Sequence, residues 1–270
     1  MVDLAELLAD LDAESADLDA LVAPLPDAAW ATPTPAEGWT IAHQIAHLAW
    51  TDQVSRLAAT DTAAFFASVA DAGEDIGGFV DRTTASFLAP PPELLARWRS
   101  GRAALAAALA AVPPGTKLPW YGTAMSPASM ATARIMETWA HGLDVADTLG
   151  VVRPPTVRLR HIAHIGARTV GHGFVAHGQE PPDRPVRVEL VAPDGSLWTF
   201  GPEGTADRVT GPALDFCLLV TQRRHRADLA LRATGPVADA WLDVAQAFAG
   251  PPGKGRPPAQ DPPPAQDRQP

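Results

Sequence analysis

The chain has 270 residues, and its 21 Lys and Arg against 31 Asp and Glu give a formal net charge of −10. This acidic balance offers no general attraction to phosphate backbones or anionic lipids, so we expect neither nucleic acid nor a membrane surface as a partner. The longest apolar run, Ala103 to Val112, is far shorter than the roughly 20 residues that span a bilayer, and the acidic first residues show no secretory signal, so a cytoplasmic protein is expected.

Four amphipathic helices are predicted in the first half of the chain. Leucines recur on a helical period across residues 3–25, and a second apolar-periodic segment follows Thr40, which can cap it. A third helix begins near Pro91 and continues to about Val112. Ser126 and Pro127 open the fourth, which Gly150 closes. Four long helices predict an antiparallel four-helix bundle, whereas residues 61–90 and 113–125 are expected to be loops.

The spacing of apolar residues changes in the second half of the chain. One more helix is expected over residues 157–178, and alternating apolar and polar residues around Asp194 and Gly195 then predict a β-hairpin. Short strand and helix patterns follow as far as residue 250. We therefore predict the α+β class, with a bundle at 1–153, a small α+β domain at 154–250 and a disordered Pro-rich tail at 251–270.

Glu137 and His141 are the most informative pair of residues. Their four-residue interval places both side chains on one face of a helix, one turn apart, so that both can ligate one ion. The same spacing is common on solvated helix faces. Here apolar neighbours such as Ile135 and Trp139 surround the pair, and an unpaired carboxylate would be costly among them. The pattern therefore indicates a metal site.

A third ligand is expected from the helix that follows Thr40. His47 lies between Ile45 and Leu48 near the apolar face and can point into the bundle, but a buried histidine bonded to a carbonyl would show the same pattern. His43, one turn earlier, competes for the role, and the spacing does not separate the two. We favour His47 because it lies deeper in the helix.

These two segments, GWTIAHQIAHLAW and ARIMETWAHGLDVADTLG, resemble the metal-binding N-terminal domain of the mycothiol-dependent maleylpyruvate isomerase family, within the wider DinB-like bundles. The resemblance covers roughly residues 3–250. The chain is also similar to actinobacterial metal-binding proteins that carry a wyosine base formation domain label. Carried over by position, the family's divalent metal ligands, with zinc the usual ion, are His47, Glu137 and His141. Mycothiol is then a candidate cofactor.

Arg223 and Arg224 are the candidates for a functional arginine that the family places in its C-terminal domain. An arginine fork can bind an anionic substrate, but a solvated basic helix end would look the same. Cys217, the single cysteine, lies among apolar residues and is expected to be a buried thiol.

The resemblance implies a metal-dependent isomerase or thiol transferase, in which a metal-bound thiolate acts on a small electrophile. A His2Glu ligand set suits Zn²⁺ and leaves a coordination position open for the thiol. A non-catalytic metal- or small-molecule-binding protein on the same bundle is the alternative, and a bundle without metal is a third hypothesis. The expected partners are a small-molecule substrate or thiol, and the chain is expected to be a monomer or a small homo-oligomer.

Overall fold

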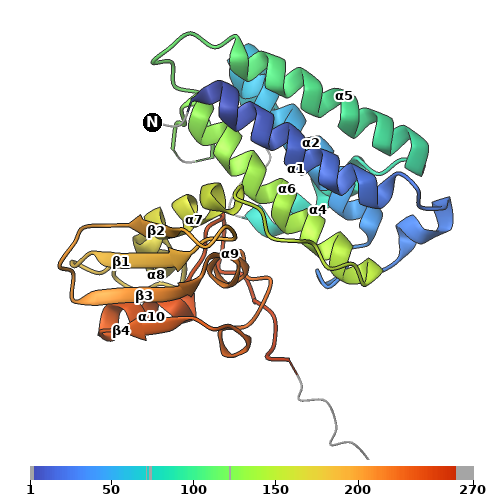
Figure 1. Ribbon diagram of the computed structural model, residues 1–270. Helices are drawn as coiled ribbons and strands as arrows, with labels where there is room; N and C mark the ends of the chain where they lie inside the picture. The colour runs from blue at the N-terminus through green and yellow to red at the C-terminus, as the bar shows by residue number, and fades with distance from the viewer. Residues whose placement is uncertain (1–2, 71, 73–74, 122, 260–270) are drawn as a thin grey trace, which may run out of the picture. The chain divides into compact units, whose positions relative to one another are not determined.

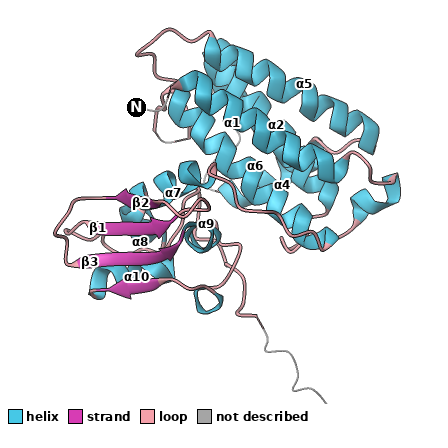
Figure 2. Ribbon diagram, viewed as in Figure 1, coloured by secondary structure: helices cyan, strands magenta, loops and turns pink. Residues whose placement is uncertain are grey.

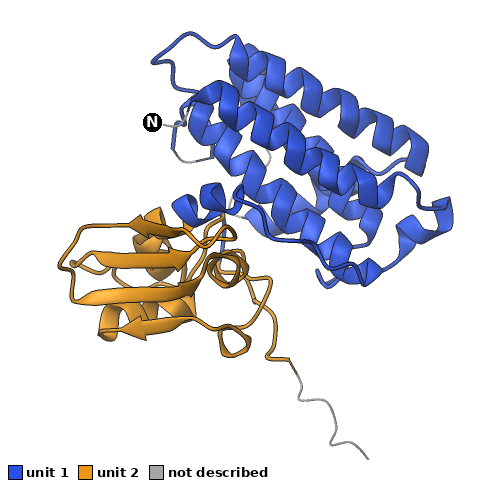
Figure 3. Cartoon of the chain, viewed as in Figure 1, with its two compact units in different colours: residues 1–165, 249–251 blue, residues 166–248, 252–270 orange. Residues whose placement is uncertain are grey.

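The computed structural model describes residues 3–70, 72, 75–121 and 123–259, and the chain divides into two compact units (Figure 3). The first unit is Met1–Ile165 with Ala249–Pro251, and the second is Gly166–Phe248 with Pro252–Pro270. Helices make up the first unit, and a small sheet with helices makes up the second (Figure 2). The predicted α+β class is therefore confirmed, while the domain boundary at residue 153 stays a prediction.

The first unit is a bundle in which four long helices lie side by side (Figure 1). Helix α2 packs against α5 and α6, and α1 packs against α6 and α5. All four helices correspond to predicted ones. The elements that begin in this unit are α1 (Leu4–Val22), the 3-10 helix η1 (Asp27–Ala31), α2 (Ile41–Thr60), α3 (Thr62–Val69), α4 (Ile76–Ser86), α5 (Pro91–Ala110), α6 (Pro127–Leu149) and α7 (Leu159–Arg168).

Helix α6, which carries Glu137 and His141, begins and ends where its sequence signals stand. The Ser126 hydroxyl accepts a hydrogen bond from the Ser129 N–H at 3.1 Å, which satisfies one of the free donors at the helix start. Gly150 follows the last turn with φ 67°, a left-handed conformation that glycine adopts without the steric cost of a Cβ atom. Both caps fix the two candidate ligands within the middle of the helix.

The expectation of a loop over residues 61–90 was wrong, because α3 and α4 lie within it. Asp61 accepts from the Ala64 N–H at 3.0 Å, and Asp75 caps α4 by accepting from the Gly78 N–H at 2.9 Å. Each helix is short and would be unstable alone. Burial of Phe65 and Phe79 in the bundle core supplies the tertiary stabilisation that the local sequence pattern did not reveal.

Two apolar clusters form the core of the bundle. One contains Trp98 and Leu94 of α5 with Ile41 and Ile45 of α2, all fully buried or nearly so. The other lies further along the same helices and includes the aromatic rings that pack around Phe65. Burial of these large side chains provides the main stabilisation of the unit, and it holds α2 and α6 against each other.

The second unit is built on a four-stranded sheet in the order β2-β1-β3-β4. The predicted hairpin pairs β1 with β2 in antiparallel fashion, while β1 and β3 are parallel and β3 and β4 antiparallel. Helix α10 packs against α8, β3 and β4. The strands are β1 (Val186–Val191), β2 (Leu197–Phe200), β3 (Asp207–Pro212) and β4 (Arg232–Thr234), and the helices are α8 (Val170–Ala176), α9 (Ala213–Val220), η2 (Arg226–Asp228) and α10 (Pro236–Val244).

The single helix predicted over residues 157–178 is two helices, α7 and α8, which are separated at Thr169. The Thr169 hydroxyl and N–H both donate to the Gly166 carbonyl, at 3.1 and 3.2 Å, which tightens the last turn of α7. In α8, a Cβ at Gly173 would lie 2.4 Å from the Val244 carbonyl oxygen. Only glycine therefore permits the close approach of α8 to the end of α10.

Cys217 is fully buried, as expected. Of the predicted tail, residues 251–259 have no regular secondary structure, and 260–270 lie outside the described residues. No helix in the described part of the chain combines the length and the apolar character that crossing a bilayer requires.

Candidate metal centre

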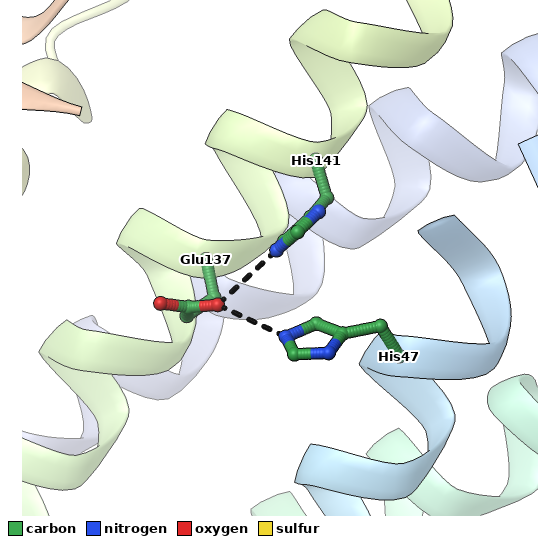
Figure 4. Close-up of side chains that lie close together, drawn as sticks. All are labelled: His47, Glu137 and His141. Carbon is green, nitrogen blue, oxygen red and sulfur yellow. Dashed lines mark hydrogen bonds and ion pairs between the residues drawn. The ribbon is translucent and has the colours of Figure 1, made fainter. Parts of the chain in front are cut away.

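The side chains of His47, Glu137 and His141 converge between α2 and α6 (Figure 4). One carboxylate oxygen, Glu137 Oε2, lies 3.4 Å from His47 Nε2 and 3.3 Å from His141 Nε2. The two imidazole rings are 4.5 Å apart at their centroids. The four-residue interval places Glu137 and His141 on one face of α6, and the bundle packing brings His47 to that face from α2.

The three candidate ligand atoms lie within 4.8 Å of one another, and the two histidine-to-glutamate distances fit a tetrahedrally coordinated ion. Two ligand atoms held about 2.1 Å from a tetrahedral zinc ion lie about 3.4 Å from each other, and both Nε2 to Oε2 distances agree with that value. Two imidazole nitrogens and a carboxylate oxygen are also a donor set that zinc accepts readily. Among the described residues this cluster has three His, Asp or Glu members, which is the number typical of a site with an open position.

Burial dominates the electrostatics of the cluster. It is the main cause that lowers the pKa of His47 to about 4, and the nearby His141 lowers it further. Burial by itself raises the pKa of Glu137, but the hydrogen bonds with His141 and His47 outweigh it and hold the pKa well below its usual value. At neutral pH the site therefore presents a carboxylate and an uncharged His47 imidazole, which are the forms that bind a cation.

His43, the competitor that the sequence left open, does not join the cluster. Its Nδ1 lies 3.2 Å from the Thr40 N–H and 2.8 Å from the Thr40 hydroxyl. Since the backbone N–H can only donate, His43 Nδ1 accepts and serves as part of the cap of α2. The structure thus separates two histidines, one turn apart on α2, into a cap and a member of the cluster.

The opposite side of each imidazole also has a polar neighbour, which the sequence reasoning missed. His141 Nδ1 lies 2.5 Å from Gln44 Oε1, and His47 Nδ1 lies 3.4 Å from the Thr84 hydroxyl. Gln44 and Thr84 are both fully buried. For Gln44 a sequence signal existed, since an amide one turn before His47 interrupts an apolar helix face. For Thr84 none was visible, because α4 itself was not predicted.

Two tryptophans, Trp39 and Trp50, lie against the histidine rings of the site. The Trp39 ring stacks on His141, with centroids 5.8 Å apart and an interplanar angle of 17°, and it lies 5.2 Å from His47. Its indole N–H donates to Asp81 at 3.0 Å. The Trp50 ring meets His47 edge on, with ring centroids 5.5 Å apart and an interplanar angle of 74°. These rings limit solvent access to the imidazoles and restrict their rotation.

A buried ion pair lies close to the cluster and connects the same two helices. Arg134 of α6 donates to Asp52 of α2 at 2.9 Å, with side chains 2% and 5% exposed. Arg134 stands one turn before Glu137. Burial raises the pKa of Asp52, while the Arg134 charge and hydrogen bond oppose that rise. The pair therefore helps to fix how α2 and α6 align, and with it the positions of the candidate ligands.

Arg223 and Arg224 lie in the second unit, just after α9. The Arg223 guanidinium donates to the Thr221 carbonyl, and that of Arg224 donates to the Arg223 carbonyl, each at 2.7 Å. Gln222, which precedes them, has a left-handed backbone with φ 58°. Arg224 lines a pocket of about 250 Å³ whose other basic residues are His177, His225, Arg226, Lys254 and Arg256. The catalytic role predicted for these arginines stays a prediction.

In this protein, two long helices of a bundle bring two histidines and a glutamate together. The fold and the cluster therefore place it in the class of helical-bundle proteins with a candidate metal centre. Within that class the chain belongs to the family described as mycothiol maleylpyruvate isomerase N-terminal domain, which matches residues 11–146. The resemblance seen in the sequence is thereby confirmed. Residues 182–234 match a second family, described as wyosine base formation.

Similar proteins are known from both sequence and structure. Two uncharacterized proteins of Mycobacterium tuberculosis strains, Rv0036c and MT0041, are each 56% identical to the chain over 257 residues, covering 95% of the chain and all of the relative. A crystal structure of the mycothiol-dependent maleylpyruvate isomerase is 17% identical with a TM-score of 0.58, covering 86% of this chain and 93% of the other. A histidine-to-alanine mutant of that enzyme matches with the same TM-score and coverage at 16% identity. These structures share the fold of the chain.

Proposed function

We propose that the protein is a metal-dependent enzyme of the mycothiol-using isomerase or thiol-transferase type, acting on a small electrophilic substrate. His47, Glu137 and His141 would hold a divalent ion, with zinc favoured. The observation that carries this proposal is the convergence of both Nε2 atoms on one Glu137 oxygen at 3.3 and 3.4 Å. Membership of the mycothiol maleylpyruvate isomerase N-terminal domain family supports mycothiol as the thiol.

The charges of the ligand set suit a thiol cofactor. Neutral imidazoles and one carboxylate leave a single positive charge on a divalent ion, which is enough to attract a thiolate without binding it irreversibly. Such an ion supplies a position at which a thiol is deprotonated at neutral pH. Cys217 is buried, and the proposed chemistry needs no protein thiol.

The protein residues around the site would orient the reactants and exclude water. Trp39 and Trp50 cover the two imidazoles, so that an electrophile would reach the thiol in a partly dry environment, where charge interactions are stronger. An anionic group on the substrate would need a guanidinium partner, and we assign that role to Arg223 or Arg224. The proposed substrate is therefore a small electrophile that carries an anionic or polar group.

Elemental analysis of the purified protein tests the metal centre. We expect about one equivalent of zinc or another divalent metal in the wild type, and none in His47→Ala or Glu137→Ala, because each change removes a ligand. His172→Ala, which alters an exposed histidine of the second unit, is the matched control and should keep its metal. A wild-type protein that holds no metal, even after zinc is added back, would contradict the proposal.

Turnover separates the enzyme from a non-catalytic binding protein on the same bundle. The zinc-loaded protein is incubated with mycothiol and an electrophile such as maleylpyruvate, and loss of the conjugated substrate is followed by absorbance. The enzyme proposal expects turnover that His47→Ala abolishes. Metal binding without turnover across a panel of electrophiles would favour the alternative, a metal- or small-molecule-binding protein.

A further inference from the structure

Gln44 lies one turn before His47 on α2 and faces α6. Its side chain is fully buried, and its amide oxygen lies 2.5 Å from His141 Nδ1, on the side of the ring away from Glu137. A buried amide in an apolar helix face is costly unless each of its polar atoms has a partner. The partners of Gln44 therefore indicate what its side chain does.

A series of hydrogen bonds fixes the orientation of the Gln44 side-chain amide, that is, which position its oxygen occupies and which its nitrogen. The Trp39 carbonyl can only accept, and the Thr34 hydroxyl donates its single proton to it at 2.9 Å. The Thr34 oxygen must then act as an acceptor toward Gln44, whose Nε2 donates to it at 2.8 Å. Because the amide nitrogen is committed to Thr34, the amide oxygen is the atom that faces His141.

An amide oxygen beside Nδ1 determines where His141 carries its proton. The oxygen accepts only, so Nδ1 must carry a proton to make a hydrogen bond over 2.5 Å. A neutral imidazole has one ring proton. A His141 ring that binds a metal while its Nδ1 proton stays on Gln44 must therefore use the lone pair of Nε2, which is the nitrogen 3.3 Å from Glu137 Oε2 and would give up its hydrogen bond to that oxygen when the ion binds. With the proton on Nε2 instead, two lone pairs would face each other across the Gln44 contact.

We propose that Gln44 is a positioning residue that holds His141 as the Nδ1-protonated imidazole, with the Nε2 lone pair directed at the metal. This inference rests on the proposed metal centre and adds a fourth residue to it. Histidine ligands commonly donate their second N–H to an oxygen acceptor, which orients the ring and increases its basicity. The 33–40 segment supplies both the hydrogen bonds that orient Gln44 and the Trp39 ring that stacks on His141.

The test is the zinc affinity of the full chain, measured by competition with a chelator of known affinity. Gln44→Met keeps the length and volume of the side chain but removes the acceptor, and we expect it to weaken zinc binding by about 10- to 100-fold. Gln53→Met changes an exposed glutamine on the same helix and should bind zinc as the wild type does. Gln44→Met with affinity within twofold of wild type would overturn the inference.

A second variant separates positioning from a purely structural role. Gln44→Glu retains an oxygen acceptor for His141 but loses the N–H donor to Thr34. Positioning predicts zinc affinity much closer to wild type than to Gln44→Met, whereas a structural role predicts a loss at least as large as that of Gln44→Met and would overturn the inference. If the wild type itself binds no zinc, the proposed metal centre fails first and the role of Gln44 fails with it.

A measurement on the unaltered protein covers the case in which Gln44→Met does not fold. In the zinc-loaded wild type, the proton on His141 Nδ1 should be visible in long-range proton–nitrogen NMR spectra and should exchange slowly with water, because it is bonded to Gln44. Rapid exchange of that proton in a zinc-loaded protein would contradict the inference.

Discussion

At the residue scale, the same residue type serves different purposes one turn apart. His43 and His47 lie on α2 with similar sequence surroundings, yet His43 accepts from the Thr40 N–H while His47 meets Glu137. The difference comes from the neighbours each ring finds in space. His47 faces α6, whereas His43 turns back toward the start of its own helix. The deeper position of His47 in the helix favoured it as the ligand, but the sequence spacing did not separate it from His43.

His43→Ala should therefore leave the metal content unchanged and reduce stability. Loss of the ring leaves the Thr40 N–H without its acceptor, and a lost helix cap of this kind costs about 1 kcal/mol of unfolding free energy. Urea denaturation and elemental analysis of the same preparation check both halves of this expectation. Loss of metal in His43→Ala would return His43 to the list of ligands.

At the element scale, α6 was the most predictable helix and α4 the least. Ser126, Pro127 and Gly150 bracket α6 with unambiguous caps, and the Glu-x-x-x-His interval within it needed no tertiary information. Helix α4 contains two adjacent glycines and is stabilised by packing of Phe79 in the core, which no local pattern encodes. Thr84 was missed for the same reason. Gln44 was missed because its partner His141 lies far away in the sequence.

The Arg134–Asp52 pair allows a test of how α2 and α6 are held together. Arg134→Met should destabilise the protein by about 3–5 kcal/mol, because it leaves a buried carboxylate without its cation. The double variant with Asp52→Leu removes the charge as well and should recover a large part of that loss. Thermal or urea unfolding of both variants measures the difference. Equal destabilisation in the single and double variants would contradict this account.

The stability of the single variant Arg134→Met should also depend on pH, in a direction that the environment of Asp52 determines. Burial already raises the pKa of Asp52, and removal of Arg134 removes the main opposing effects. When the pKa of a carboxyl is higher in the folded than in the unfolded state, the folded state holds the proton more tightly. The free energy of unfolding therefore falls as the pH rises from the unfolded-state pKa to the folded-state pKa. The loss of unfolding free energy caused by Arg134→Met, measured against wild type, should therefore be smaller at pH 5 than at pH 7.

At the scale of the whole molecule, we expect the fold not to depend on the proposed metal. The apolar clusters of the bundle contain large buried side chains that do not depend on the three candidate ligands, and the second unit has its own sheet and helices. The bundle is thus expected to fold without an ion. This differs from small zinc domains, whose folding free energy is supplied by the metal.

Removal of the metal by a chelator should accordingly lower the melting temperature without unfolding the protein at 25 °C. A ligand present at a thousand times its dissociation constant stabilises the folded state by about 4 kcal/mol, and this amount should be lost and then regained when zinc is restored. Calorimetry follows the shift, and far-ultraviolet circular dichroism follows the helices. A chelated protein that loses its helical signal would show that folding requires the ion.

The compact arrangement of Thr34, Trp39, Gln44 and His47 along one short stretch has a consequence for recognising such centres in other genomes. A sequence pattern that requires only a histidine and a distant Glu-x-x-x-His pair selects every chain that has the three candidate ligands. A stricter pattern would also demand the glutamine three positions before the histidine. Chains that satisfy the loose pattern but not the strict one would be the natural candidates for centres with altered or absent chemistry.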